Sequence, residues 1–138
     1  MAKDRVRQVV KNALIKEGWN VTHDPLPIKV GGVDMEIDLG AEQLLAAERG
    51  DEKIAVEVKS FLASTSAISQ FHTALGQFIN YRAALRQQEP GRVLYLAIPD
   101  LAYNKFFQLD FPASMLQENQ VKVIVYSTNL EEIMQWRN

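Results

Sequence analysis

Two short runs in which apolar and charged residues alternate place the strongest constraint on the fold. The alternating apolar residues are Val33, Met35, Ile37 and Leu39 in the first run, and Ile54, Val56 and Val58 in the second. A period of two is typical of half-buried β strands, in which alternate side chains point to opposite faces. The pattern therefore predicts two strands, and it places Glu57 and Lys59 on one face of the second.

The charged residues of these two runs suggest a site at a sheet edge. Glu36 and Asp38 share a face of the first predicted strand, as Glu57 and Lys59 do in the second. If the two strands pair, Asp38, Glu57 and Lys59 bring two carboxylates and one ammonium group together. Such a set can hold a divalent metal ion beside a phosphate. Glu36 is a candidate auxiliary ligand.

Periodicity and turn residues give the expected order of the remaining elements. We expect helices over residues 4–17, 41–49, 66–88, 103–107 and 130–136, short strands within 19–30, a hairpin turn at Gly31-Gly32, and strands over 92–98 and 121–126. A strand, a long helix and a strand follow one another between residues 54 and 98, which predicts a parallel crossover. The predicted fold class is α/β, with a mixed central sheet flanked by helices.

Composition narrows the class of protein. The chain has 138 residues, 47% of them hydrophobic, which suits one compact domain over residues 1–138. It contains no cysteine, so we expect neither disulfides nor a thiolate zinc site, and a reducing cytoplasm is the expected location. No apolar run approaches the roughly 18 residues of a membrane span. The formal charge of −2 means that any nucleic-acid contact depends on a local basic patch.

The acid followed by Glu-x-Lys matches the nuclease signature written PD-(D/E)XK. In that signature the acids, here Asp38 and Glu57, bind magnesium, and the lysine, here Lys59, orients or deprotonates the attacking water. The main-chain carbonyl of the middle residue, Val58, commonly adds another oxygen ligand. The alternative is a solvated strand that alternates Glu and Lys. The apolar residues around the triplet oppose that alternative, because a charge placed there without a task is costly.

A second match lies on the helix that follows. Gln77 and Tyr81 are four residues apart and therefore share a helix face. Their spacing matches the Gln-x-x-x-Tyr motif of RecB-like members of the same nuclease superfamily, in which these residues help to hold the substrate strand and the metal site. A chance pairing at a helix rim is the alternative. Ser60 could either bind a phosphate or cap a turn.

Two further surfaces remain open to two interpretations. Lys3, Arg7 and Lys11 share one face of the first helix, which could meet a phosphate backbone or simply be solvated. The aromatic residues between 103 and 111 could fill the core or form an interface with a partner or a second copy.

Taken from end to end, the chain resembles the XisH family of cyanobacterial proteins, the fdxN-element excision controlling factors. The segments that carry the resemblance are Ala2-Lys3-Asp4, residues 10–14, Gly18-Trp19, residues 22–25, 37–42, 53–61 and 74–78, Tyr81-Arg82, and residues 94–97. The resemblance implies an endonuclease-like fold and a role in excising a DNA element during heterocyst differentiation. It also implies a site-specific recombinase and a small companion protein, XisI, as partners.

Together these observations lead to one expected function and one rival. We expect a magnesium-dependent, endonuclease-like factor in DNA excision, in which Asp38, Glu57 and the Val58 carbonyl hold the metal, Lys59 positions water, and Gln77, Tyr81 and Ser60 contact DNA. A homo-oligomer is expected, because cutting both strands of a duplex requires two sites. The rival is a non-catalytic adaptor that keeps the fold and binds a companion protein or recombinase. A component of a two-protein toxin or antitoxin locus is a third, weaker option.

Overall fold

The computed structural model describes residues 2–35, 44–62 and 66–138. Its main sheet has six strands, which in spatial order are β1 (Asn20–His23), β4 (Leu44–Arg49), β5 (Glu52–Val58), β6 (Arg92–Pro99), β7 (Val123–Ser127) and β8 (Glu132–Arg137). The pairs β5–β6 and β6–β7 are parallel and the other pairs are antiparallel, so the sheet is mixed. This sheet and its helices confirm the predicted α/β class and are consistent with a nuclease-like fold.

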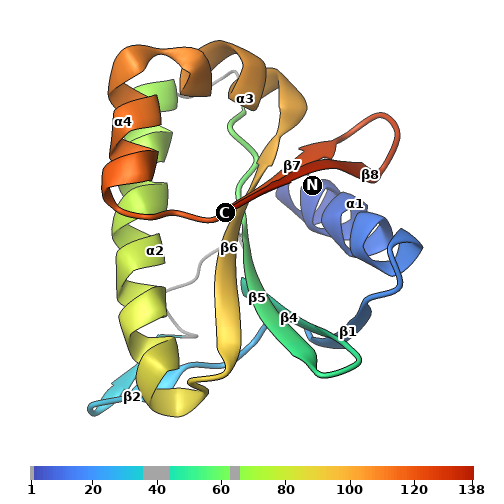
Figure 1. Cartoon of the computed structure of the whole chain (residues 1–138), viewed down its shortest axis with the longest axis vertical. Coiled ribbons are helices and arrows are strands. Elements are labelled where there is room, and N and C mark those ends of the chain that lie inside the picture. Colours follow the sequence, from blue (N-terminus) through green and yellow to red (C-terminus); the bar gives the residue numbers. More distant parts are fainter. Residues whose placement is uncertain (1, 36–43, 63–65) are drawn as a thin grey trace.

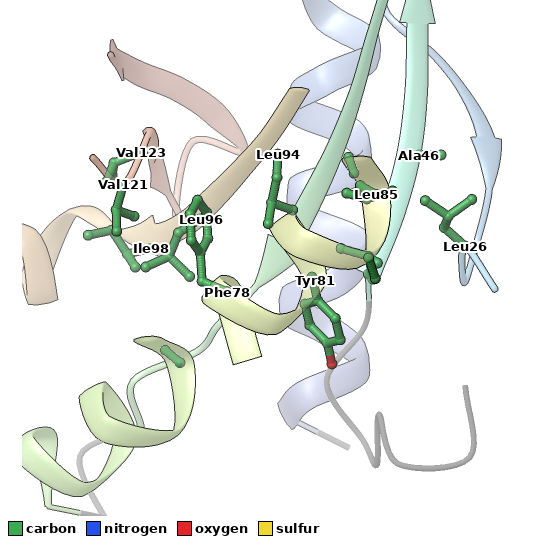
Figure 2. Close-up of a cluster of buried hydrophobic side chains, with 14 of the residues drawn as sticks. Leu26, Ala46, Phe78, Tyr81, Leu85, Leu94, Leu96, Ile98, Val121 and Val123 are labelled. Atoms are coloured by element: carbon green, nitrogen blue, oxygen red, sulfur yellow. The ribbon is translucent and has the colours of Figure 1, made fainter. Parts of the chain in front are cut away.

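Helices cover both faces of the sheet (Figure 1). The helical elements are α1 (Ala2–Lys16), α2 (Ala67–Gln88), α3 (Asp100–Lys105), the short 3₁₀ helix η2 (Phe106–Gln108) and α4 (Asp110–Glu118). α2 packs on one face, where Phe78 and Leu85 are buried in one cluster with Leu94 and Leu96 of β6 (Figure 2). α1 packs on the other face with a separate apolar cluster. None of the described helices is long and apolar enough to cross a membrane.

The crossover from β5 through α2 to β6 matches the prediction closely. β5 and β6 are parallel, with Glu57 opposite Leu96, and α2 begins within one residue of the predicted start. The side chain of Ser66 accepts a hydrogen bond from the Ser69 amide, which satisfies one of the free N–H groups at the helix start. The predicted hairpin turn at Gly31-Gly32 is also present, and it joins β2 (Lys29–Val30) to β3 (Val33–Asp34).

The helix predicted over residues 41–49 is wrong, because residues Leu44–Arg49 form strand β4. Ala, Leu, Glu and Arg favour helices intrinsically, but Leu44 and Ala47 are fully buried and lie on opposite faces of a covered sheet. A two-residue turn at Gly50-Asp51 then leads directly into β5, since Arg49 pairs with Glu52. Gly50 has φ +59°, a conformation in which a side chain would be strained.

This hairpin also corrects the pairing expected for the acidic strand. β5 has β4 on one side and β6 on the other, so the described part of the run that begins at Val33 does not pair with it. Within that run the structure describes β3, which forms a separate two-stranded sheet with β2. Glu36 and Asp38 lie outside the described residues.

The helix predicted over residues 130–136 is also wrong, because Glu132–Arg137 form the edge strand β8. The pairing with β7 shifts between Val125 and Tyr126, so that Gln135 and Ile133 face consecutive residues and Met134 is the extra residue of a bulge. The bulge lets Ile133 and Trp136 both pack on the cluster beneath α1. Their spacing of three residues therefore imitates a helix.

Candidate functional site

Glu57 and Lys59 lie together on the α2 face of the sheet, at the end of β5. Ile54, Val56 and Val58 pack in the cluster under α1, while Ala55 packs under α2, so Glu57 also faces α2. Glu57 is 2% exposed and Lys59 is 6% exposed. Glu57 Oε2 is 3.8 Å from Lys59 Nζ. The prediction that the two charges share one face is confirmed.

The surroundings of Glu57 are apolar within the sheet. Its partners on the neighbouring strands are Leu44 of β4 and Leu96 of β6, and both are fully buried. A carboxylate and an ammonium group enclosed in this way require strong mutual compensation, because each loses its hydration. The burial excludes a solvated strand that alternates Glu and Lys.

Gln77 of α2 completes the contact with the lysine. Lys59 Nζ donates a hydrogen bond to Gln77 Oε1 at 2.5 Å. The crossover makes this contact, because α2 runs back over the face of β5 from which Glu57 and Lys59 project. The first residue of the Gln-x-x-x-Tyr pair is therefore at the site, as the match to that motif suggested.

The backbone at Lys59 is held from two further strands. Its amide donates to Ala97 O of β6 at 3.0 Å, and its carbonyl accepts a hydrogen bond from the Tyr126 hydroxyl of β7 at 2.8 Å. Two residues later Phe61 has φ +48°, which is unfavourable for a bulky side chain. Such strain persists only where the surrounding structure enforces it. The chain therefore turns sharply, immediately after the Glu-x-Lys segment.

Sequence reasoning missed Tyr126 and the turn at Phe61. Tyr126 is the last apolar residue of β7, and no pattern in the sequence separates it from a core residue. Its hydrogen bond to Lys59 follows only from the parallel arrangement of β5, β6 and β7, which brings the carboxyl ends of the three strands to the same end of the sheet. A positive φ at Phe61 has no sequence signal, because it is not a residue type that favours this conformation.

The other predicted site residues are Val58, Ser60, Tyr81 and Asp38, and the structure describes the first three. Ser60 is buried directly after Lys59, and Val58 pairs with Ala97. Tyr81 lies one turn beyond Gln77 and is 5% exposed in the core beneath α2. Its hydroxyl points away from the labelled aliphatic side chains (Figure 2). Asp38 lies outside the described residues.

The donors at this site suit part of a magnesium site. Glu57 supplies a carboxylate and Val58 a neighbouring carbonyl, and magnesium prefers oxygen ligands. Among the described residues there is no group of three or more His, Cys, Asp or Glu side chains that could hold a metal ion. A second carboxylate ligand would come from outside the described residues, and Asp38 is the predicted one.

Two cations of the basic face considered on α1 are paired with one carboxylate. Lys11 Nζ is 2.8 Å from Asp24 Oδ2, and Arg7 Nε is 3.7 Å from Asp24 Oδ1. Asp24 belongs to the segment that follows β1, so these cations fix the loop against α1. This observation favours the structural interpretation of the helix face over a phosphate-binding one.

Comparison with known proteins agrees with the resemblance. The family model described as XisH protein matches residues 1–134. A crystal structure of an XisH family protein from Nostoc punctiforme PCC 73102 is 61% identical, with a TM-score of 0.91, over 98% of this chain and 100% of that one. A crystal structure of an fdxN element excision controlling factor protein from Anabaena variabilis is 60% identical, with a TM-score of 0.92, over 98% of this chain and 99% of that one. No curated protein matches the chain. The chain belongs to the XisH family.

Proposed function

We propose that this protein is a DNA element excision controlling factor with a magnesium-dependent nuclease site of the PD-(D/E)XK type. The observation that carries the proposal is the buried contact of Lys59 with both Glu57 and Gln77 at the carboxyl end of β5. Burying a carboxylate and an ammonium group in an apolar sheet is costly and seldom favours stability over a hydrophobic pair. The fdxN name of the Anabaena variabilis relative supports the role in excision.

The metal would be held by Asp38, Glu57 and the Val58 carbonyl. When bound, magnesium would polarise a phosphate oxygen and lower the pKa of a bound water. Lys59 would orient the attacking water through its ammonium group, which also donates a hydrogen bond to Gln77. The Tyr126 hydrogen bond to the Lys59 carbonyl would fix the backbone from which this side chain projects.

DNA is the proposed substrate. Ser60 and Tyr81 would contact the strand, and Gln77 would align it by way of Lys59. The contacts of Lys59 with Glu57 and Gln77 are short and buried, so these side chains are firmly held. This suits a hydrolytic site, in which the placement of the reacting groups provides much of the catalysis. A homodimer would allow one site to act on each strand of a duplex.

Manganese titration tests the metal site, with two matched variants of the same strand. Glu57→Gln should weaken manganese binding at least tenfold by calorimetry, because it removes a charged ligand. Glu52→Gln, an exposed acid at the other end of β5, should bind manganese like the wild type. Circular dichroism checks that both variants are folded. Equal manganese affinity in the wild type and Glu57→Gln would remove Glu57 from the metal site.

Lysine variants of the same strand test the chemistry. Lys59→Met should lower the rate of magnesium-dependent DNA cleavage by about 10²–10⁴-fold, the usual contribution of a group that moves or orients a proton. Lys53→Met, an exposed lysine on β5, is the control and should cleave normally. If the wild type and Lys59→Met cleave DNA at the same rate, the nuclease proposal fails.

A non-catalytic adaptor is the second candidate, and two observations favour it. Glu57 and Lys59 are 2% and 6% exposed, so the described structure gives a phosphate little access to them. Leu101 of α3, Leu109 between η2 and α4, and Phe111 of α4 are 71%, 57% and 58% exposed. Exposed apolar residues gathered in this way mark interaction surfaces. The partner would be an XisI-like companion protein or a recombinase, and binding without any cleavage would support this role.

A further inference from the structure

A wide groove lies beside the C-terminal half of α2, between the α3–α4 region, the start of β7 and the end of β8. Its volume is about 900 Å³. Its basic lining residues are Arg82, Arg86, Lys122 and Arg137. Gln108, Gln117 and Gln120 add amide groups that can donate hydrogen bonds. We call this surface the basic groove. Glu57, Lys59 and Gln77 do not line it, so it is separate from the candidate nuclease site.

The basic groove is positively charged in a chain whose formal net charge is −2. None of the described residues that line it is Asp or Glu. Within the part of the chain that the structure describes, none of its four cations forms an ion pair with a carboxylate. Two cations on α1 differ in this respect, since Arg7 and Lys11 both pair with the carboxylate of Asp24. Clefts lined by one sign of charge concentrate the field and attract ions of the opposite sign.

Two cations of the basic groove, Arg82 and Arg86, lie near each other. Arg82 Nη1 donates hydrogen bonds to the carbonyls of Asn119 and Gln120, at 2.7 and 3.2 Å, beyond the end of α4. Burial lowers the pKa of Arg82, and the nearby Arg86 lowers it further. Two guanidinium groups that repel one another favour a bound anion between or beside them.

The shape of the basic groove suits an extended ligand. A second, smaller hollow shares Arg82, Arg86, Gln120 and Lys122 with it and continues along α2 as far as Pro90 and Val93. Arg82 and Arg86 of α2 and Lys122, just before β7, therefore line both hollows, and Arg137 of β8 lines the larger one. A single small anion would use only part of it, whereas a chain of regularly spaced phosphates could engage several cations at once.

We infer that the basic groove binds the phosphodiester backbone of a nucleic acid, with Arg86, Lys122 and Arg137 contacting phosphates. The inference rests on the proposed function, because it assigns that function's DNA partner to a defined surface. Contacts of this kind fix position on the nucleic acid and carry no sequence information. Arg82 would shape the groove through its hydrogen bonds to the carbonyls of Asn119 and Gln120, and its charge would add to that of the other three cations.

Fluorescence anisotropy with labelled DNA tests the inference in EDTA, without any metal. The probes are a 20-base-pair duplex and a single strand of 20 nucleotides. The groove variant combines Arg86→Gln, Lys122→Gln and Arg137→Gln, and leaves Arg82 in place because of its structural bonds. We expect at least a tenfold loss of affinity for the probe that binds best, and a fall of about 2–3 in the slope of log affinity against log salt.

A control variant removes three cations elsewhere. It combines Arg5→Gln, Lys29→Gln and Lys53→Gln, all exposed and outside the groove. Its net charge equals that of the groove variant, and it should bind DNA like the wild type. An equal loss in both variants would show a net-charge effect and overturn the inference, as would unchanged binding by the groove variant or no binding by the wild type. Should the triple variant misfold, the exposed Arg86→Gln alone must still lower the affinity.

The outcomes separate this inference from the proposed function. A protein that binds DNA through the groove but binds no manganese would refute the nuclease site alone. A protein that binds manganese and cleaves DNA, while the groove variant keeps its DNA affinity, would refute the groove alone. Binding of polyglutamate in preference to DNA would indicate an acidic protein partner and would overturn the assignment to nucleic acid.

Discussion

The buried pair of Glu57 and Lys59 should be strongly coupled in the free energy of unfolding. At their separation of 3.8 Å the attraction is about 4 kcal/mol for an effective dielectric constant near 20. The exposed pair Lys29 and Asp34 has nearly the same separation, 3.9 Å, but in water its attraction is about 1 kcal/mol before salt screening. The two pairs differ mainly in burial, which makes the exposed pair a matched control.

A double-mutant cycle measures this coupling. Glu57→Gln and Lys59→Met should each cost about 3–5 kcal/mol, because each leaves its partner buried with less compensation. The double variant should lose about 2–4 kcal/mol less than the sum of the two single losses. The corresponding cycle for Lys29 and Asp34 should give a coupling of about 0.2–1 kcal/mol.

Urea unfolding followed by circular dichroism, in buffer with EDTA, gives each free energy. Coupling energies that are equal for the buried and the exposed pair would refute the reasoning. So would additive losses at Glu57 and Lys59, because they would mean that the two charges do not compensate one another in the folded protein.

Two further predictions concern the backbone at the site and the exposed apolar residues. Tyr126→Phe should lower the free energy of unfolding by about 1–3 kcal/mol, because it leaves the Lys59 carbonyl without this buried donor, whereas Tyr95→Phe, which loses an exposed hydrogen bond, should cost less than about 0.5 kcal/mol. Similar losses in urea unfolding would contradict this. Sedimentation at micromolar concentration should show that the wild type self-associates and that Phe111→Ser weakens the association, while Ile15→Ser, equally exposed on α1, does not; a monomeric wild type would exclude this interface.

The sequence predicts well those elements in which the hydrophobic pattern and the length of the segment indicate the same type of secondary structure. The residues before Glu57 alternate as in a strand, a long amphipathic helix follows, and an apolar strand follows the helix. This order predicts the parallel crossover that the structure shows. That topology also explains why Gln77 could be associated with Lys59. A helix that returns over the strand preceding it must cover the face on which alternate residues of that strand lie.

Two elements could not be predicted, because tertiary packing overrides local preference. The residues of β4 favour a helix, but both faces of this strand are covered, so its apolar residues run without alternation. The prediction of β8 as a helix is wrong for another reason. Its bulge adds one residue, and Ile133 and Trp136 reach the same face with the spacing of a helix. A bulge of this kind is decided by the partner strand, which the local sequence does not contain.

The basic groove shows why net charge is a weak guide to binding partners. Its cations come from residues 82, 86, 122 and 137, so no segment of the chain is strongly basic. Only the packing of α2 beside the start of β7 and the end of β8 brings them together. At physiological salt, exposed charges more than about 8 Å apart are largely screened from one another. A phosphate in the groove would therefore respond chiefly to the cations that line it, while acids elsewhere on the surface would contribute little. A chain with a formal charge of −2 can for this reason present a surface that favours a polyanion.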